Sequence, residues 1–484
     1  MRKNGWAILL ALLLAFSLAG CSVDWNKLAY ENVFELNRDE RDAMSADEII
    51  RQRREAEREA ITHNPVDDLE EAFTIILEQC TGEFIGNHPI DETFLLWMYA
   101  KYGEQIIEEI ATAVKNEYKD PTVWYHLTGN SIQVLWLLYC RDSGFQTEEL
   151  EGVYWCEAAS PDEAVFDFTG DVNFTDGLGN MRHMRESAGG IEDCFSDDLL
   201  LEMRSADICM INNEFTYSTR GEPLEGKPFT FRADPSTVGL LSDLGVDIVG
   251  IANNHVYDYG PDALCDTVDT LDEAGMPHVG AGKNLDEAMK PVYFVLNGRK
   301  FGIVAATQIE RSLNYTKEAT ADSPGVLKTL DPTKFVKVIA DTKKNADMVF
   351  VFVHWGTEGN SSYGSDQAEL ARKFVDAGAD AIIGGHTHCL QGITYIGNVP
   401  VIYSLGNYWF SSTPTDGQRA KETGIAQVRV DYEGMINFRF LPCEMANWET
   451  TLLTDPSSAS RVIAYEESLS NGVTIDQDGY VSKK

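Results

Sequence analysis

The chain has 484 residues, which is enough for two or three domains and a large hydrophobic core. It carries 77 acidic residues against 39 basic ones, a formal net charge of -38 at pH 7. This balance excludes nucleic acid as a partner, because nucleic-acid binding needs basic patches, and it disfavours docking of the protein surface on anionic lipid.

Residues 1–21 have the pattern of a lipoprotein signal peptide. A basic start precedes an apolar run over residues 6–16, which is too short for a helix that spans a bilayer of about 30 Å. Small residues then lead to Cys21, in a string, Leu-Ala-Gly-Cys, that resembles a bacterial lipobox. We therefore expect acylation of Cys21 and a lipid anchor at the extracytoplasmic face of the cell membrane. An ordinary signal peptide with a chance cysteine is the alternative.

The other eight cysteines are scattered over more than 360 positions, with no CxxC pair and no metal-type spacing. They are too sparse for a disulfide scaffold in an exported chain of this size. We expect most of them to be buried as small apolar residues.

The N-terminal third of the mature chain divides into two parts. Residues 22–66 are dense in charge, most of all over 51–59, and this pattern predicts a solvated helical tether. Residues 67–160 carry apolar side chains at helical spacing, which predicts a small all-helical domain. The spacing is clearest at Leu69, Ala72, Phe73, Ile76, Leu77 and Cys80, and again at Ile106, Ile107, Ile110, Ala111 and Val114.

Short β-rich runs alternate with amphipathic helical segments from residue 161 onward, as at 260–275 and 364–378. The alternation predicts an α/β domain with layered sheets over 161–450, followed by a C-terminal extension over 451–484. The expected strands are 165–169, 208–211, 247–251, 301–306, 348–353, 381–383 and 399–405.

Polar clusters follow these strands immediately, where ligands gather in α/β folds. They supply carboxylate, amide and imidazole groups, the ligand set of borderline divalent metals. In an extended segment residues two apart share a face, so His386 and His388 can point into one site, as can Asp171 and Asn173. The clusters are 169–174 (TGDVNF), 212–214 (NNE), 252–260 (ANNHVYDYG), 354–358 (HWGTE) and 384–388 (GGHTH).

The order of the clusters resembles that of the calcineurin-like metallophosphoesterases, which present Asp, an acidic residue, Asn-His, His and His-x-His. The wording of the clusters, with YSLGN at 403–407, is similar to the CapA family, which is associated with poly-γ-glutamate capsules. The similarity covers roughly residues 165–412. It implies a layered α-β-β-α metallophosphoesterase-like sandwich, preceded here by the small all-helical domain.

The resemblance also implies one or two divalent metal ions, of Mn, Zn, Fe or Mg, and metal-assisted hydrolysis. Two ligand sets are expected, which share one bridging carboxylate. The first set is Asp171, Glu214 and His388, and the second is Glu214, Asn254, His354 and His386. The sequence departs from the wider superfamily twice. The first-strand Asp-x-His is Asp171-x-Asn173, so one imidazole is missing, and the bridging residue is Glu214 where an Asp is usual.

Four further residues receive roles from the resemblance. His255 would transfer a proton to the leaving group, and Asp258 would orient its imidazole. Arg232 is a candidate for holding an anionic group of the substrate, with a surface ion pair as the alternative. Asn407 is a candidate for contact with the substrate or for support of the ligands.

Three functions follow as hypotheses. The first is a hydrolase that acts on an envelope polymer or its precursor, cleaving a phosphoester or a γ-glutamyl amide. The second is a non-catalytic lipoprotein that helps to assemble or tether a capsule, with capsule-synthesis membrane proteins as partners; the missing imidazole favours it. The third, a solute-binding lipoprotein, does not explain the order of the metal-ligand residues.

Overall fold

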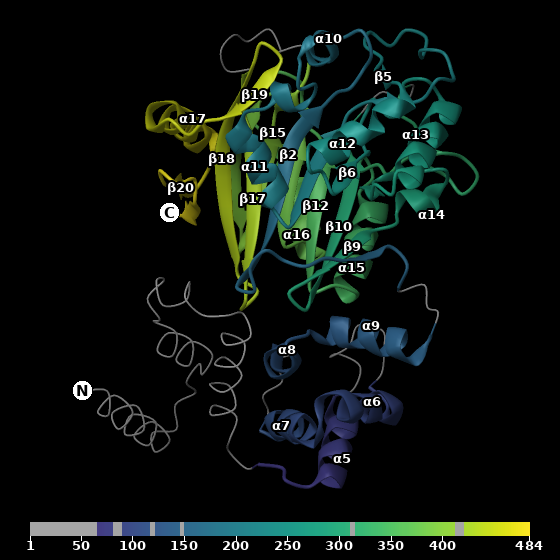
Figure 1. The fold of residues 1–484 in the computed structure, drawn as a ribbon, viewed down its shortest axis with the longest axis vertical. Coiled ribbons are helices and arrows are strands. Elements are labelled where there is room, and N and C mark those ends of the chain that lie inside the picture. Colours follow the sequence, from purple (N-terminus) through teal and green to yellow (C-terminus); the bar gives the residue numbers. More distant parts are fainter. Residues whose placement is uncertain (1–64, 81–89, 117–121, 146–149, 310–314, 412–420) are drawn as a thin grey trace.

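The computed structural model describes residues 65–80, 90–116, 122–145, 150–309, 315–411 and 421–484 (Figure 1). The predicted signal peptide with Cys21, and the predicted tether up to residue 64, lie outside the described residues. Within the described ranges, no helix combines the length and the apolar character that a membrane span requires.

The helices between residues 69 and 143 gather at one end of the molecule (Figure 1). Polar residues cap several of their N-termini; Asp68 and Asp91, for example, accept hydrogen bonds from backbone N–H groups of the first turn. Their apolar faces pack into a core of their own, which includes Phe94, Ile107 and Trp124. The helices are α5 (Leu69–Gln79), α6 (Glu92–Tyr102), α7 (Glu104–Lys115), α8 (Thr122–Thr128) and α9 (Ile132–Ser143).

Two large mixed β-sheets form the centre of the remaining described chain. The first sheet has the order β1 (Val153–Trp155), β9 (Val292–Leu296), β10 (Arg299–Thr307), β12 (Met348–His354), β13 (Ala381–Gly385), β15 (Val399–Leu405), β14 (Leu390–Ile396). The second has the order β19 (Glu449–Leu452), β18 (Ile436–Ala446), β17 (Glu422–Asp431), β2 (Glu163–Val172), β3 (Ile208–Asn213), β6 (Ile248–Gly250), β7 (His278–Val279), with β16 (Asn407–Trp409) also paired to β2.

The two sheets pack face to face through a buried aromatic cluster. The ring of Phe166 on β2 lies 4.7 Å from the ring of Phe301 on β10 and 4.9 Å from that of Phe350 on β12. Strands that are covered on both faces read as near-continuous apolar runs, which is why the sequence pattern marked them as strands.

Helices cover the outer face of each sheet. Side chains of α10 (Gly179–Glu186), α11 (Asp197–Ser205) and α13 (Pro261–Glu273) pack on the second sheet. Those of α15 (Thr333–Lys344) and α16 (Ser365–Asp376) pack on the first. The layers are therefore α-β-β-α, preceded by a helical region, and the predicted fold class is confirmed.

Shorter elements complete the described chain. They are β4 (Thr216–Tyr217), β5 (Arg232–Ala233), β8 (Ala281–Gly282), β11 (Gly325–Val326), β20 (Val473–Ile475), β21 (Val481–Lys483), α12 (Gly239–Asp243), α14 (Leu285–Ala288), α17 (Pro456–Leu469) and the 3₁₀ turns 192–194 and 235–238.

Two segments bear on the predicted domain boundaries, which stay predictions. Strand β1 lies inside the range predicted as helical, 67–160, and pairs in parallel with β9 at the edge of the first sheet. In the range predicted as a C-terminal extension, Val462 and Ile463 of α17 and Val473 of β20 are buried in the core between the sheets. Both segments are thus built into the sandwich.

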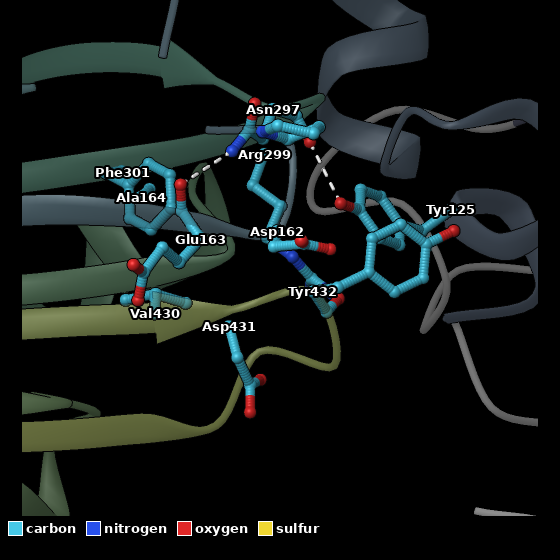
Figure 2. A pocket seen from close by; sticks show the side chains of 11 residues that line it. Tyr125, Asp162, Glu163, Ala164, Asn297, Arg299, Phe301, Val430, Asp431 and Tyr432 are labelled. Atoms are coloured by element: carbon cyan, nitrogen blue, oxygen red, sulfur yellow. Dashed lines mark hydrogen bonds between the residues drawn. The ribbon is translucent and has the colours of Figure 1, made fainter. Parts of the chain in front are cut away.

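The helical region meets the sandwich at the amino-terminal ends of β2 and β10, where a small pocket opens (Figure 2). The guanidinium of Arg299 lies 3.9 Å from the ring centre of Tyr125 on α8 and donates to the carbonyl of Tyr432 at 2.6 Å. The Tyr125 hydroxyl donates to the carbonyl of Asn297 at 3.0 Å. We call these four residues the Arg299 clamp.

The cysteines behave as the sequence predicts. Among the described residues none is in a disulfide, and six of the eight are buried. Burial raises the pKa of Cys80 to about 11 and that of Cys194 to about 12, so these thiols stay protonated and act as small apolar groups.

Candidate metal centre

The carboxyl ends of four parallel strands converge on one edge of the sandwich. Asp171 at the end of β2 is in register with Asn212 of β3, and His354 at the end of β12 is in register with Gly385 of β13. A side chain at Gly385 would place its first carbon 2.8 Å from an oxygen of Asp171, so only glycine lets the two sheets approach this closely.

The structure brings five of the predicted ligands into two overlapping groups. In each group the ligand atoms lie within 4.8 Å of one another. The groups are Asp171, Glu214 and His388, and Glu214, His354 and His386. These are the two sets that the family resemblance implies, less Asn254, and they share Glu214. The role of each residue stays a prediction.

Asn254, the remaining predicted ligand, joins the second group through its side chain. Its amide oxygen lies 2.8 Å from Nε2 of His354, and the same Nε2 lies 3.1 Å from Nδ1 of His386 and 3.5 Å from Oε1 of Glu214. One ring nitrogen carries at most one hydrogen, so it cannot satisfy three such neighbours. A cation among these atoms would satisfy all of them.

Glu214 provides the test of whether a metal fits. Its carboxylate is fully buried, and neither oxygen accepts a hydrogen bond from any described residue. Burial, and then the nearby Asp171 carboxylate, raise the pKa of Glu214 well above its ordinary value. A buried carboxylate without a donor is unfavourable unless it is paired or coordinates a metal. Carboxylate, amide and imidazole donors at this spacing therefore fit a divalent ion.

His386 and His388 reach the centre through an irregular backbone. Strand β13 ends at Gly385, and the φ angles of the two histidines are 94° and 58°, which few residues other than glycine adopt. Nδ1 of His388 lies 2.8 Å from Oδ1 of Asn407 and 3.5 Å from Oδ2 of Asp171. Asn407, predicted at the substrate, thus contacts a predicted ligand. Strained backbone of this kind clusters at functional sites.

Asp171 and His388 shift each other's pKa. Burial, the largest single cause, acts to raise the pKa of Asp171 and to lower that of His388. Their mutual contact outweighs burial, together with the effects of His354 and Asn212 on Asp171 and of Glu358 and Asn407 on His388. The pKa of Asp171 is therefore lowered and that of His388 is raised. This pairing keeps Asp171 charged although it is fully buried.

His255 and Asp258 form a buried pair beside the two ligand groups. Nδ1 of His255 lies 2.7 Å from Oδ2 of Asp258, and Nε2 lies 3.8 Å from Oε1 of Glu214. A carboxylate only accepts, so Nδ1 carries the hydrogen and Nε2 faces the centre. The ring of Phe231 lies against the imidazole at 4.3 Å. Burial, together with the nearby Lys227 and His388, lowers the pKa of His255 although Asp258 acts to raise it.

The contacts of Arg232 are with residues outside the two ligand groups. Its guanidinium donates to the carbonyls of Arg220 and Gly221, both at 3.2 Å, and lies 4.1 Å from the ring centre of Tyr259. It is partly buried, and these contacts hold the chain around β5. The proposed contact of Arg232 with an anionic group stays a prediction.

Sequence reasoning missed Lys227. Its side chain is 4% exposed, and its ammonium donates to Oδ1 of Asp258 at 2.6 Å and to the carbonyl of Asn254. A single lysine in a loop has no spacing or periodicity that could have identified it. Only the fold brings it to residues about thirty positions later in the chain.

Asn212 was also given no role of its own. Its amide nitrogen donates to Oδ1 of Asp171 at 2.7 Å and lies 3.1 Å from Nδ1 of His354, so it links the two ligand groups. Asn212 lies two residues before Glu214, at the end of β3, and this spacing was an available signal.

Asn173 does not point to the ligands as its spacing from Asp171 suggested. Strand β2 ends at Val172, so the alternation of faces stops there. The Asn173 amide oxygen accepts from the backbone N–H of Thr175 at 2.8 Å, and its nitrogen donates to the carbonyl of Glu214 at 3.4 Å. The side chain stabilises the turn after the strand.

Comparisons with known proteins match the part of the chain that holds these residues. Residues 165–412 match the family described as bacterial capsule synthesis protein PGA_cap, and they include every residue of the two ligand groups. TT1561, a Thermus thermophilus protein of known structure, aligns over 58% of this chain and all of its own with 9% identity and a TM-score of 0.33, too low to define the fold.

Three curated relatives match the same part of the chain. PGA biosynthesis protein CapA of Bacillus subtilis (strain 168) is 32% identical over 234 residues, 48% of this chain and 60% of its own. Capsule biosynthesis protein CapA of Bacillus anthracis is 32% identical over 234 residues, 48% of this chain and 55% of its own. A probable polyglutamine synthesis accessory protein of Mycobacterium tuberculosis is 31% identical over 216 residues, 43% of this chain and 57% of its own. The chain thus spans 55–60% of the length of these relatives.

The family match covers just over half of this chain, which therefore belongs to the bacterial capsule synthesis protein family PGA_cap.

Proposed function

We propose that this protein is a metal-dependent hydrolase that acts on an anionic envelope polymer or its precursor. The observation that carries the proposal is Glu214, a fully buried carboxylate without a hydrogen-bond donor among the described residues, at the junction of two ligand groups. Glu466 is also a buried carboxyl without a donor among the described residues, but only at Glu214 do imidazoles and a second carboxylate converge, where a divalent ion would compensate the charge.

The bound ion would supply Lewis-acid chemistry, activating water as a nucleophile and stabilising charge on the scissile group. Glu214 would bridge the two ligand groups. Asn212 holds Asp171 and His354 at their spacing, and Asn407 holds the ring of His388. These contacts fix the direction of each donor before substrate binds.

His255 is the group in place for proton transfer. Asp258 holds its Nδ1, so its Nε2 faces the centre at the side of Glu214. In hydrolysis the hydroxyl of water goes to the phosphorus or carbonyl carbon, and a proton goes to the departing oxygen or nitrogen. Nε2 of His255, which carries no proton in the neutral ring, would take a proton released by the attacking water and pass it to that departing atom. The rings of Phe231 and Phe410 lie against His255 and His388 and shield one side from water.

The substrate class follows from the family and from charge. Two of the matched relatives are named for capsule or PGA biosynthesis, so a γ-glutamyl polymer is the first candidate and a phosphoester the second. The acidic chain repels a polyanion at long range, but physiological salt screens charges beyond about 8 Å, and bound metal reverses the sign locally.

We also propose that the protein is attached to the cell membrane by a lipid on Cys21, at the extracytoplasmic face. The lipobox-like string before Cys21 supports this. Capsule-synthesis membrane proteins would be natural partners of an enzyme held there.

One observation favours a second function, a non-catalytic role in capsule assembly or tethering. The position of the superfamily's first-strand imidazole is Asn173, whose amide is engaged with Thr175 and the backbone of Glu214. The first ligand group therefore has one donor fewer, which weakens metal binding there.

The two functions are separated by experiment. Purified mature protein, loaded with Mn²⁺ or Zn²⁺, is assayed for bound metal by elemental analysis and for hydrolysis of bis(p-nitrophenyl) phosphate and poly-γ-glutamate. The hydrolase requires bound metal and turnover that a chelator abolishes. Bound metal with no turnover on either substrate supports the assembly role. No bound metal at any pH from 6 to 9 contradicts the metal centre itself.

A further inference from the structure

We propose that Lys227 is a positioning residue of the metal centre, whose single buried ammonium fixes both the loop of Asn254 and the orientation of His255. The proposal rests on the hydrolase function only for its kinetic readout. The geometry that carries it is independent of activity.

Lys227 lies in the segment between β4 and β5, and its ammonium makes two contacts across to residues 254–258. It donates to the main-chain carbonyl of Asn254 and, at 2.6 Å, to Oδ1 of Asp258. The lysine side chain is 4% exposed and the aspartate 0%, so neither charge is solvated and the two charges stabilise each other.

The contact extends through Asp258 to His255. While Oδ1 of Asp258 faces Lys227, its Oδ2 accepts from Nδ1 of His255 at 2.7 Å and from the backbone N–H of Phe231 at 2.7 Å. The carboxylate is thus fixed from three directions. Because it cannot turn, it holds the hydrogen of His255 on Nδ1 and leaves Nε2 toward Glu214.

The contact with Asn254 acts on a candidate ligand. The carbonyl of Asn254 is held by Lys227, and its side-chain oxygen lies 2.8 Å from Nε2 of His354. One ammonium therefore sets the backbone of a predicted ligand and, through Asp258, the ring of the predicted proton donor.

A lysine suits this position because it is a compact charge with three donors. Two donors serve the carbonyl and the carboxylate, and the ring of Tyr315 lies 5.9 Å from the ammonium. A guanidinium is larger and planar, so an arginine here would keep the charge but would not reproduce the two hydrogen bonds of the ammonium.

The test compares Lys227→Met, which removes the charge at similar length, with Lys227→Arg, which keeps the charge. The matched control is Arg220→Met, which removes a cation of the same segment. Arg220 is 55% exposed and pairs with Asp266 on α13. Each mature protein is assayed for Mn²⁺ content, for kcat and KM on the substrate that wild type hydrolyses, and for the His255 tautomer by ¹⁵N NMR of the ring nitrogens, with His255→Gln to assign the signals.

We expect Lys227→Met to keep at least half of the bound Mn²⁺, to lose roughly ten- to a hundredfold in kcat with less than threefold change in KM, and to lose the single Nδ1–H tautomer. Lys227→Arg should recover the tautomer and part of kcat. Arg220→Met should match wild type in all three measurements.

If Lys227 serves only as a structural ion pair, a different result is expected. Lys227→Met would then unfold at lower temperature but keep wild-type kcat and the Nδ1–H tautomer, and this outcome overturns the proposal. If Lys227→Met does not fold, the double variant Lys227→Met, Asp258→Asn removes both buried charges together and is compared with Asp258→Asn alone. In Asp258→Asn, Lys227 takes the one amide oxygen and leaves the amide nitrogen toward Nδ1 of His255, so the proposal expects the Nδ1–H tautomer to be lost. In the double variant the amide can turn its oxygen to Nδ1, and a tautomer that returns there supports the proposal. The same tautomer state in both overturns it.

Failure of the hydrolase function is distinguishable from failure of this inference. If wild type hydrolyses neither substrate, the hydrolase proposal fails. The tautomer in Lys227→Met still decides the role of Lys227.

Discussion

His354 and His386 point ring nitrogens at each other at the ends of the neighbouring strands β12 and β13, with Nε2 of the first 3.1 Å from Nδ1 of the second. Burial lowers the pKa of His354 to about 3 and that of His386 well below its ordinary value. Both imidazoles are therefore neutral at physiological pH and offer lone pairs to the same small volume. A metal ion is the ligand that such a pair accepts most readily.

The first prediction separates ligation from proton transfer. His386→Ala should lose most of the bound metal and, with it, stability and turnover, because metal binding is coupled to the folded site. His255→Ala should keep the metal and lose roughly a hundredfold in turnover. Elemental analysis and kinetics on the two variants give the comparison. His183→Ala is the control, since His183 pairs with Glu449 at the surface. Equal loss of metal in both site variants would show that His255 is itself a ligand.

The second prediction concerns Glu214. A carboxyl whose pKa is raised in the folded state destabilises the fold as pH rises above its unfolded value. In a chelator, Glu214→Gln should therefore be more stable than wild type at pH 7 by about 1–3 kcal/mol, with a smaller gain at pH 5. With Mn²⁺ present the order should reverse, because the variant loses the bridging charge. Urea denaturation in both conditions measures this.

Glu466 provides the matched control for that experiment. It is a buried carboxyl of α17 whose pKa is also raised well above its ordinary value, first by burial and then by Glu422, and it is outside the two ligand groups. Glu466→Gln should stabilise the protein to the same extent with and without Mn²⁺. If Glu214→Gln also changes stability by the same amount with and without Mn²⁺, then Glu214 does not bind the metal.

The third prediction concerns Asp167, which lies on β2 four residues before Asp171. Burial raises its pKa from 3.8 to about 8, although Gln427 donates a hydrogen bond to it. Between pH 4 and pH 8 the folded state holds a proton that the unfolded state releases, so this group lowers stability as pH rises. Asp167→Asn should lose about 3–4 kcal/mol less stability than wild type between pH 5 and pH 8, as measured by urea denaturation at each pH. Parallel pH profiles for the two proteins would refute this.

The fourth prediction concerns the Arg299 clamp. Tyr125→Ala removes a buried ring from Arg299 and should cost about 3 kcal/mol in stability, with faster proteolysis between the helices and the sandwich. Bound metal should not change, because the clamp is at the opposite strand ends. Trp155→Ala, which removes an exposed ring from Arg141, is the control and should change stability by less than about 1 kcal/mol. Equal effects of the two would contradict the clamp.

The strands and the ligand order could be predicted from the sequence because both are local signals. Apolar runs such as 348–353 read as buried strands, and the structure extends this one by a single residue, to His354. Two-residue strands such as β4 and β5 could not be found, because they exist only through pairing with each other across the segment that carries Lys227.

The site shows where local reasoning ends. His386 and His388 were expected to share a face of an extended strand. They converge instead through two residues of positive φ beyond the strand end, which no alternation rule describes. The prediction that Asn173 points into the same site as Asp171 was wrong for a similar reason, because β2 ends at Val172, one residue before Asn173. The contact of Asn407 with His388 depends on β16 pairing with β2, a long-range event.

The Arg299 clamp and the candidate metal centre lie at opposite ends of strand β2. Strand β2 begins at Glu163, whose carbonyl accepts from Asn297 of the clamp, and reaches Asp171 in the metal centre eight residues later. At about 3.3 Å per residue, roughly 26 Å separates the two ends. If the chain is held at a membrane by its N-terminus, the helical region lies nearer the membrane and the candidate metal centre lies at the far end of the sandwich. The candidate metal centre would then face away from the membrane, toward substrates that arrive from outside.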